Sequence, residues 1–424
     1  MLNRTTAPDF KQVNDINFIE PTKQELDNGI KVFTVNAGEQ ELVRIEFIFE
    51  NVNWDEKKPL QAVTVNNLIN NGTKTLTAKE IAEKVDYYGA FLQTEYGADH
   101  TVITLYSLNK HLEAVLPIIW SILNESIFPA QELAIFMQNQ KQKLQVNLQK
   151  NDFLARKAFA NAIFGQTPYG VDIKIEDYDA LMQTDLLAYY SAAFKPSNCI
   201  IIAAGKFESA EFDLLNKFFG KNWENNQPST SNQFDFSPIG GSEIYVKKDD
   251  AVQSAIRMGN LSINRTHKDF PSLQILNTLL GGYFGSRLMA NIREDKGYTY
   301  GIGSGIASLK DAGYFFIATE VGTDVCASAL QEIEKEIELL KTDLVAEEEL
   351  NLVRNFMLGS LLGSLENAFS HADKFKNIYF SGLGYDYYTN YIATVKSITA
   401  TEIKSIANTY LNWDAMTRVV VGKK

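Results

Sequence analysis

Several short segments alternate apolar with polar residues, which is the pattern of a strand with one buried face. In the first half of the chain, Gly29–Val35 predicts a strand. After a turn, a half-buried strand is predicted from the apolar positions Val43, Ile45, Phe47 and Phe49. A helical segment follows and is expected to end near glycine, at Asn71-Gly72.

The second half repeats this arrangement more weakly. Glu243–Lys247 predicts the first strand, and Val252, Ile256 and Met258 mark the next one. The helical segment after them is expected to end at Gly281-Gly282. The two halves therefore begin with the same order of elements.

Further helices follow from capping and from apolar periodicity. Thr77 and Glu80 have the spacing of a capping box, which predicts a helix that stops near Gly89. Leu112–Leu123 and the long stretch Gln131–Phe164 are helical in character. An apolar stripe at three- and four-residue steps predicts one more helix, through Val325, Ala329, Ile333, Ile337 and Leu340.

The ends of the two halves also correspond. FKPSNCIIIAAGK (194–206) and LNWDAMTRVVVGK (411–423) both join a polar turn to a short buried strand closed by Gly-Lys. Such a repeat over half the chain predicts two related domains. Residues 220–241 are rich in Asn, Gln, Ser and Pro and predict a linker. We therefore expect an α+β fold with domains at 1–219 and 242–424.

Composition narrows the class of protein. Hydrophobic residues make up 45% and charged residues 22% of the chain, which is ordinary for a globular protein. The net charge of −12 argues against nucleic acid or an anionic membrane as a partner. With no apolar N-terminal stretch and two cysteines without CxxC spacing, Cys199 and Cys326, the expected location is the cytoplasm. Cys199 is expected to be a buried, inert thiol.

One segment carries a long family motif. Leu279–Ser304 reads LLGGYFGSRLMANIREDKGYTYGIGS, and Asp311–Phe315 reads DAGYF. The order of Gly-Gly, Ser-Arg-Leu, Ile-Arg-Glu, Lys-Gly and Tyr resembles the M16 peptidase family, which includes insulinase and the mitochondrial processing peptidase. The resemblance implies two homologous sheet-and-helix domains that form half of a clamshell.

A second segment matches the same family but lacks its metal chemistry. Active members carry His-x-x-Glu-His on a helix that ends in Gly-Thr, and Gly72-Thr73 aligns that motif with Val63, Asn66 and Asn67. These three positions share one helical face. Catalytic zinc needs about three imidazole or carboxylate ligands and a general base, which valine and asparagine do not provide.

No substitute ligands are visible elsewhere in the sequence. The resemblance places a third zinc ligand near residues 143–147, but 133–151 contains no Asp or Glu. The chain's histidines are widely spaced, at His100, His111, His267 and His371. We expect each to be an ordinary structural or surface histidine, and we expect this chain to bind no metal.

The family resemblance gives Arg293 and Tyr300 the roles of binding the substrate and its tetrahedral intermediate. A guanidinium or a phenol suits this role because either can donate to a developing oxyanion. Structural alternatives are open at both positions. Arg293 could pair with Glu294 or with the end of a helix, and Tyr300 could pack across strands. Asn66 and Asn67 are read first as polar groups on a helix surface and second as part of a chamber wall.

These observations lead to one principal hypothesis and one alternative. The principal one is a non-zinc subunit that is inactive alone and supplies Arg293 and Tyr300 to a partner bearing His-x-x-Glu-His and zinc. The pair would hydrolyse short or unfolded peptides as a zinc-dependent metalloendopeptidase. The alternative is a catalytically silent structural or peptide-holding subunit. The sequence leaves open whether the isolated chain also forms a homodimer.

Overall fold

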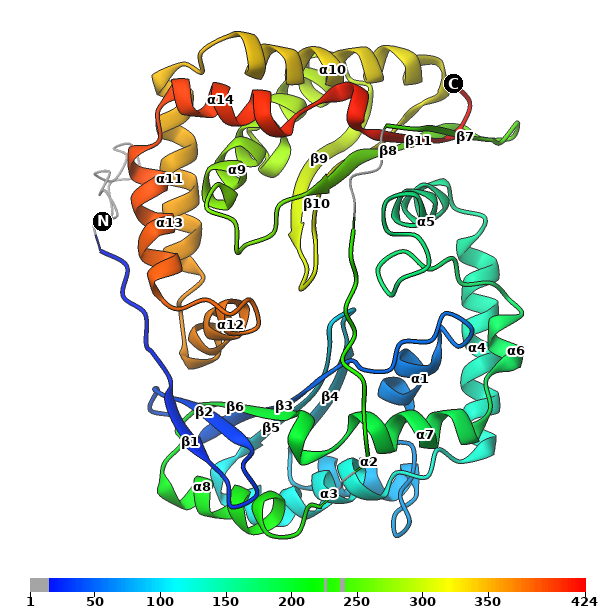
Figure 1. The fold of residues 1–424 in the computed structure, drawn as a ribbon, viewed down its shortest axis with the longest axis vertical. Coiled ribbons are helices and arrows are strands. Elements are labelled where there is room, and N and C mark those ends of the chain that lie inside the picture. The colour runs from blue at the N-terminus through cyan, green and yellow to red at the C-terminus, as the bar shows by residue number, and fades with distance from the viewer. Residues whose placement is uncertain (1–14, 225–226, 237–240) are drawn as a thin grey trace, which may run out of the picture.

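The computed structural model describes residues 15–224, 227–236 and 241–424. Figure 1 shows two sheets at opposite ends of the molecule, each covered by helices, so the α+β class is confirmed. The first sheet has the strand order β1 (Thr22–Glu25), β2 (Lys31–Asn36), β6 (Cys199–Gly205), β3 (Leu42–Glu50), β5 (His100–Leu108) and β4 (Phe91–Tyr96). The second has the order β7 (Glu243–Lys247), β11 (Thr417–Gly422), β8 (Gln253–Ser262), β10 (Gly313–Gly322) and β9 (Thr299–Ser308).

The two sheets have the same topology once β1 is set aside. In each sheet one parallel pair, β2 with β6 or β7 with β11, is followed by antiparallel neighbours. β6 and β11 both follow a 3₁₀ turn, Pro196–Asn198 or Trp413–Ala415. Both end at a glycine with positive φ, Gly205 or Gly422, as the repeated Gly-Lys predicts. The internal duplication is thus visible in strand order and in local turns.

Helices follow the strands in a similar order in the two halves. The first half contains α1 (Gln61–Leu68), α2 (Ala78–Tyr87), α3 (Leu112–Glu125), α4 (Ala130–Asn147), α5 (Asn151–Phe164), α6 (Asp177–Ala180), α7 (Gln183–Ala193) and α8 (Ser209–Leu215). The second contains α9 (Phe270–Asn277), α10 (Cys326–Thr342), α11 (Glu347–Gly363), α12 (Ala368–Tyr379), α13 (Asp386–Ser397) and α14 (Ala400–Tyr410). Two π-helical turns, η4 (Thr278–Gly282) and η5 (Met289–Asp295), follow α9. Among the helices of the described ranges, none is long and apolar enough to cross a membrane.

Several sequence predictions are confirmed with small changes. The capping box is present, since the Thr77 side chain accepts from the Glu80 amide and the Glu80 carboxylate accepts from the Thr77 amide. The long stretch 131–164 is two helices, α4 and α5, because the chain leaves the helical path at Lys150. Val252 precedes β8 and is 83% exposed, so its place in the predicted strand was wrong.

Each sheet is covered partly by a helix from the other half. Figure 1 shows α5 beside β8 and β11, and α12 over β2 and β6. Phe159 and Ile163 of α5 join the buried cluster of Val419 and Val421. Apolar residues of α12 cover the first sheet in the same way, through Ala368, Ala372 and Phe375. The halves are therefore interlocked by an exchange of helices.

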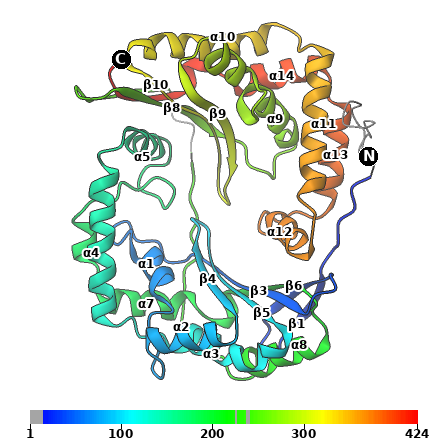
Figure 2. The ribbon, with the colours of Figure 1, turned by 180° about the vertical axis from the view of Figure 1, so that it is seen from behind.

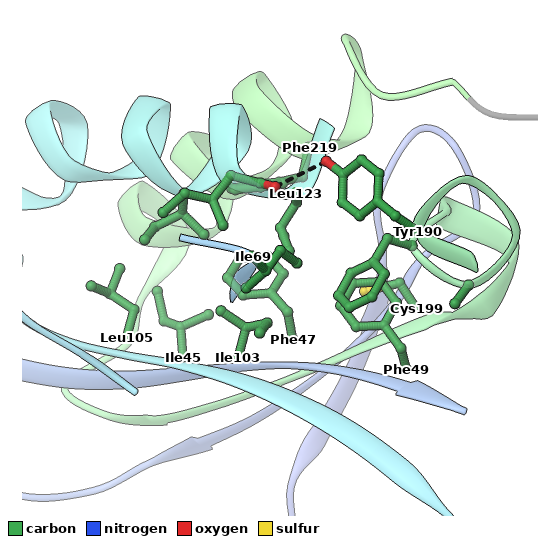
Figure 3. Packing of buried hydrophobic residues seen from close by; sticks show 14 of the residues in the cluster. Ile45, Phe47, Phe49, Ile69, Ile103, Leu105, Leu123, Tyr190, Cys199 and Phe219 are labelled. Atoms are coloured by element: carbon green, nitrogen blue, oxygen red, sulfur yellow. Dashed lines mark hydrogen bonds between the residues drawn. The ribbon is translucent and has the colours of Figure 1, made fainter. Parts of the chain in front are cut away.

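This exchange explains one failed prediction. The alternation at 43–49 predicts a strand with one solvent-exposed face, yet β3 is buried on both faces. Phe47 packs into the core of the first half (Figure 3), while Ile48 packs in the cluster formed with α12. The intervening polar residues Arg44 and Glu46 are buried as well, because α12 covers them with an ion-pair network.

The main core of the first half lies between its sheet and helices α3 and α7. Figure 3 shows Ile45, Phe47 and Phe49 of β3 pointing toward these helices. Tyr190 is buried there, and its hydroxyl donates to the Ile122 carbonyl at 2.9 Å. Cys199 lies in the same cluster, where burial raises the pKa of its thiol well above the ordinary value. An inert thiol is what this environment favours.

The predicted linker falls partly outside the described residues, at 225–226 and 237–240. Its described part runs between the two sheets, where Ser231 bridges to Val52 and Asn232 donates to the Asn51 carbonyl at 2.9 Å. Phe236 packs on Phe164 of α5. The domain boundaries at 219 and 242 stay a prediction.

Candidate functional site

The degenerate motif lies on α1, beside the edge strand β4. Val63 is partly buried and Asn67 is exposed, but Asn66 is only 1% exposed. The amide of Asn66 donates to the Glu95 carbonyl at 3.1 Å, and that of Asn67 donates to the Val63 carbonyl at 2.7 Å. The interpretation of Asn66 as a surface polar group was therefore wrong. The hydrogen bond of Asn66 to Glu95 instead joins α1 to β4.

These positions do not fit a catalytic zinc. Val63 has no donor atom, and α4 presents no carboxylate between residues 133 and 147. Glu132, at the start of α4, accepts from Asn71 at 2.9 Å. Across residues 15–224, 227–236 and 241–424, no group of three or more His, Cys, Asp and Glu side chains could hold a metal ion.

The four histidines lie apart in the fold, and each has a local contact. These are His100 with Phe380, His111 with Tyr88, His267 with the Asp269 amide, and His371 with the Ile19 amide. Burial lowers the pKa of His100 and of His371 below the ordinary value. Both then stay neutral near pH 7, and His371 can accept from Ile19 through Nδ1.

The second candidate region is the motif segment 281–301, which connects η4, η5 and β9. Gly281 lets β9 pass closely, because a Cβ there would lie 2.6 Å from the Ser304 amide nitrogen. η4 ends at Gly282, so the predicted end of a helical segment is confirmed. This close approach fixes the path of β9 against η4.

Two sets of polar contacts brace this segment against neighbouring helices. Arg287 makes a bidentate pair with Glu349 of α11, with both N···O distances at 2.7 Å. Asn291 donates to Glu332 at 3.0 Å and to Glu336 at 2.7 Å, both on α10. The Asn291 contact lowers the pKa of Glu332. Bidentate and charge-assisted bonds are the stronger class of hydrogen bond, so η5 is held firmly.

Arg293 and Tyr300 project from this braced segment. The Arg293 guanidinium lies 4.8 Å from the ring centre of Phe284, which is itself 66% exposed. No carboxylate of the described ranges, Glu294 included, forms an ion pair with Arg293. Tyr300 is 93% exposed, so it does not pack across strands within this chain. The Tyr298 amide donates to the Ile292 carbonyl at 3.0 Å and joins η5 to β9.

Tyr300 sits in a β-bulge. Ile302 pairs with Thr319 and Thr299 pairs with Val321, so Tyr300 and Gly301 together oppose Glu320. The Thr299 hydroxyl donates to the Glu320 carbonyl at 2.7 Å, which stabilises the irregular pair. A bulge re-aims the side chain at its position and is over-represented next to active sites. The sequence gives no signal for this bulge except the glycine at 301.

Comparison with known proteins adds to this geometry. Residues 181–357, which contain the whole motif segment, match the family described as "Peptidase M16 inactive domain". The resemblance to M16 peptidases is confirmed. An uncharacterized zinc protease of Bacillus subtilis, YmxG, is 26% identical over 298 residues, covering 70% of this chain and 72% of that protein. A probable inactive metalloprotease of the same organism, YmfF, is 22% identical and covers 62% of each chain.

Solved structures show the same M16 fold. A crystal structure of a peptidase M16 inactive domain from Pseudomonas fluorescens has a TM-score of 0.85 and 22% identity, covering 95% of this chain and 98% of that one. The periplasmic protease PqqL of Escherichia coli has a TM-score of 0.78 and 15% identity. It covers 100% of this chain, but this chain covers only 49% of PqqL.

Proposed function

We propose that this chain is the non-zinc subunit of a two-chain M16-type peptidase and supplies Arg293 and Tyr300 to the active site of its partner. One observation carries the proposal: a firmly braced segment presents a half-buried guanidinium and an exposed phenol, and neither forms an ion pair among the described residues. Recognition explains such a pair of groups better than stability does.

The chemistry of the two groups suits peptide hydrolysis. Attack on a peptide carbonyl places negative charge on its oxygen, and preplaced donors stabilise that charge more than they stabilise the substrate. Tyr300 offers one phenolic O–H, and Arg293 offers a fixed cation with several N–H donors. The stacking of Arg293 on Phe284 limits the rotamers of the guanidinium, which lowers the entropic cost of using it.

The missing zinc ligands require a second chain for this chemistry. Val63, Asn66 and Asn67 provide no ligand set, so the zinc and its general base would come from a partner with His-x-x-Glu-His. The match to about half of PqqL supports such a pairing, since that protease has a further half in the same chain. The expected substrates are short or unfolded peptides, and the cytoplasmic location stays a prediction.

The alternative is a structural or peptide-holding subunit without a catalytic part. The loss of every ligand position on α1 favours it, because a chain that has lost one chemical role can persist as a scaffold. The two proposals differ in what they require of Arg293 and Tyr300. Catalysis needs their donor groups, whereas a scaffold needs no particular group there.

Metal content tests which of the two chains binds the zinc. The isolated chain is expected to retain no stoichiometric zinc through dialysis, and its 1:1 complex with a His-x-x-Glu-His partner is expected to hold about one zinc per pair. Elemental analysis of size-exclusion fractions measures both. About one zinc retained by this chain alone, or two per complex, would contradict the assignment of zinc to the partner.

A further inference from the structure

A second candidate site is lined by residues of α9, α11, α12, α13 and β9 in the second half. Figures 1 and 2 show the arrangement of these elements from opposite sides. The site is a cavity of about 350 Å³. Its polar lining includes Arg265, Asn277, Ser360, Lys374 and Tyr387. Its volume suits the end of a peptide better than a whole folded partner. We call it the Arg265–Lys374 pocket.

The charge of this pocket is opposite to that of the chain. Two cations line it and none of its lining residues is Asp or Glu, although the protein as a whole carries −12. No described carboxylate forms an ion pair with Lys374, because the neighbouring Asp373 pairs instead with Arg44 at 2.8 Å and Lys376 at 3.5 Å. Burial lowers the pKa of Lys374 and the nearby charge of Arg265 lowers it further, while the Asp373 carboxylate acts in the opposite direction without cancelling them. An anion in the pocket would relieve both effects.

Arg265 is held in place by its surroundings. The Arg265 guanidinium donates to the Asn377 carbonyl at 2.6 Å and lies 5.9 Å from the ring centre of Tyr387. Tyr387 and Tyr391 stack with ring centres 6.4 Å apart, so one wall is rigid and aromatic. A preorganised guanidinium binds an anion without a large ordering cost.

A third polar group indicates what accompanies the anion. Oδ1 of Asn277 is buried and accepts no hydrogen bond from the part of the chain that the structure describes. A buried acceptor of this kind is costly unless a donor reaches it. A peptide C-terminus combines both complementary groups, since the terminal carboxylate follows directly on an amide N–H. Inorganic phosphate or a free acid lacks such an amide.

Packed aromatic side chains connect the lining of the pocket with the segment that carries the catalytic candidates. Phe356 lines the pocket and packs on Tyr283, with ring centres 4.9 Å apart. Tyr283 is followed by Phe284, the residue over which Arg293 lies. We infer that the Arg265–Lys374 pocket binds the C-terminal carboxylate of a peptide whose preceding residues run toward Arg293. This inference rests on the proposed function and specifies its substrates as peptides with a free, nearby C-terminus.

Calorimetry on the isolated full chain tests the inference. The probes are two acetylated decapeptides of one neutral sequence, one ending in a free carboxylate and the other in an amide. We expect the acid to bind at least about tenfold more tightly, because charge-assisted hydrogen bonds to the half-buried cations are lost in the amide. Lys374→Met should remove this preference, and Arg265→Gln should remove it as well. Lys268→Met, at an exposed lysine outside the pocket, should keep it.

The outcomes separate this inference from the proposed function. Equal affinity for acid and amide, including no binding of either at millimolar concentration, would overturn the inference. So would an acid preference that survives in a folded Lys374→Met chain, or displacement of both peptides alike by inorganic phosphate. The measurement needs no partner and no turnover. A failed catalytic role for Arg293 would therefore leave the acid preference intact, and loss of the preference would leave the catalytic role untouched.

Discussion

Arg293→Ala is expected to lower the kcat of the assembled pair by about 10²–10³-fold or more, with little effect on folding. The guanidinium is half-buried, makes no ion pair within the described chain and stacks on the exposed ring of Phe284. Its removal therefore breaks no ion pair in the described part of the free subunit. In the complex, by contrast, it removes a charged donor from the proposed active site. Steady-state kinetics beside a size-exclusion profile measure the effect.

Tyr300→Phe should have a smaller effect, about 10²-fold in kcat, since it deletes one phenolic donor and keeps the ring. With Tyr300 93% exposed, the melting temperature should not change. The chain offers matched controls for both variants. Arg156 lies 5.6 Å over Phe153 on α5, and Tyr87 is 82% exposed on α2. Arg156→Ala and Tyr87→Phe should leave kcat near the wild-type value. If all four variants behave alike in assembled complexes, the scaffold alternative is the better explanation.

Arg44→Ala is expected to destabilise the fold by about 2–3 kcal/mol, less than the cost of a wholly unpaired buried charge because Glu46 keeps Lys376 as a partner. The side chains of Arg44 and Glu46 are 7% and 4% exposed, and their charged atoms lie 3.2 Å apart. Arg44 also binds Asp373 of α12 at 2.8 Å. Its loss leaves Glu46 with Lys376 at 2.6 Å and loosens α12 from the first sheet. Urea unfolding followed by circular dichroism gives the change in midpoint.

An exposed ion pair provides the control for this prediction. Lys23 and Glu25 lie 3.5 Å apart on β1, and both side chains are 54% exposed. Lys23→Ala should cost less than about 1 kcal/mol, because water screens such pairs. A loss for Arg44→Ala as small as the loss for Lys23→Ala would show that the network beneath α12 contributes little to holding the halves together.

Local features of the fold could be predicted because they depend on neighbours in the chain. The capping box at Thr77 needs only Glu80, and the glycine-closed strands at Gly205 and Gly422 repeat a short pattern. The exchange of α5 and α12 was not predicted. Which sheet a helix covers depends on contacts between distant residues, such as Phe375 with Phe33, and apolar periodicity carries no information about the partner. The burial of Arg44 was missed for the same reason.

In the candidate site as well, the local sequence suggests the residues but not their tertiary contacts. The family motif suggests Arg293 and Tyr300 as candidates, but the contacts around them depend on tertiary structure. The bracing of Arg287 by Glu349 joins residues far apart in sequence, and the bulge at Tyr300 depends on its register with β10. The burial of Asn66 likewise depends on β4 passing beside α1. Residue type supports the expectation that this chain binds no metal, but it could not predict these contacts.

Reconstitution of activity tests the central claim most directly. The value to measure is kcat/KM for peptide hydrolysis by this chain, by a His-x-x-Glu-His subunit from the same organism, and by their purified 1:1 complex. The predicted result is that neither chain cleaves the peptide alone, whereas the complex does. A complex that forms on size exclusion yet is no more active than the zinc-bearing subunit alone would contradict a catalytic part for Arg293 and Tyr300.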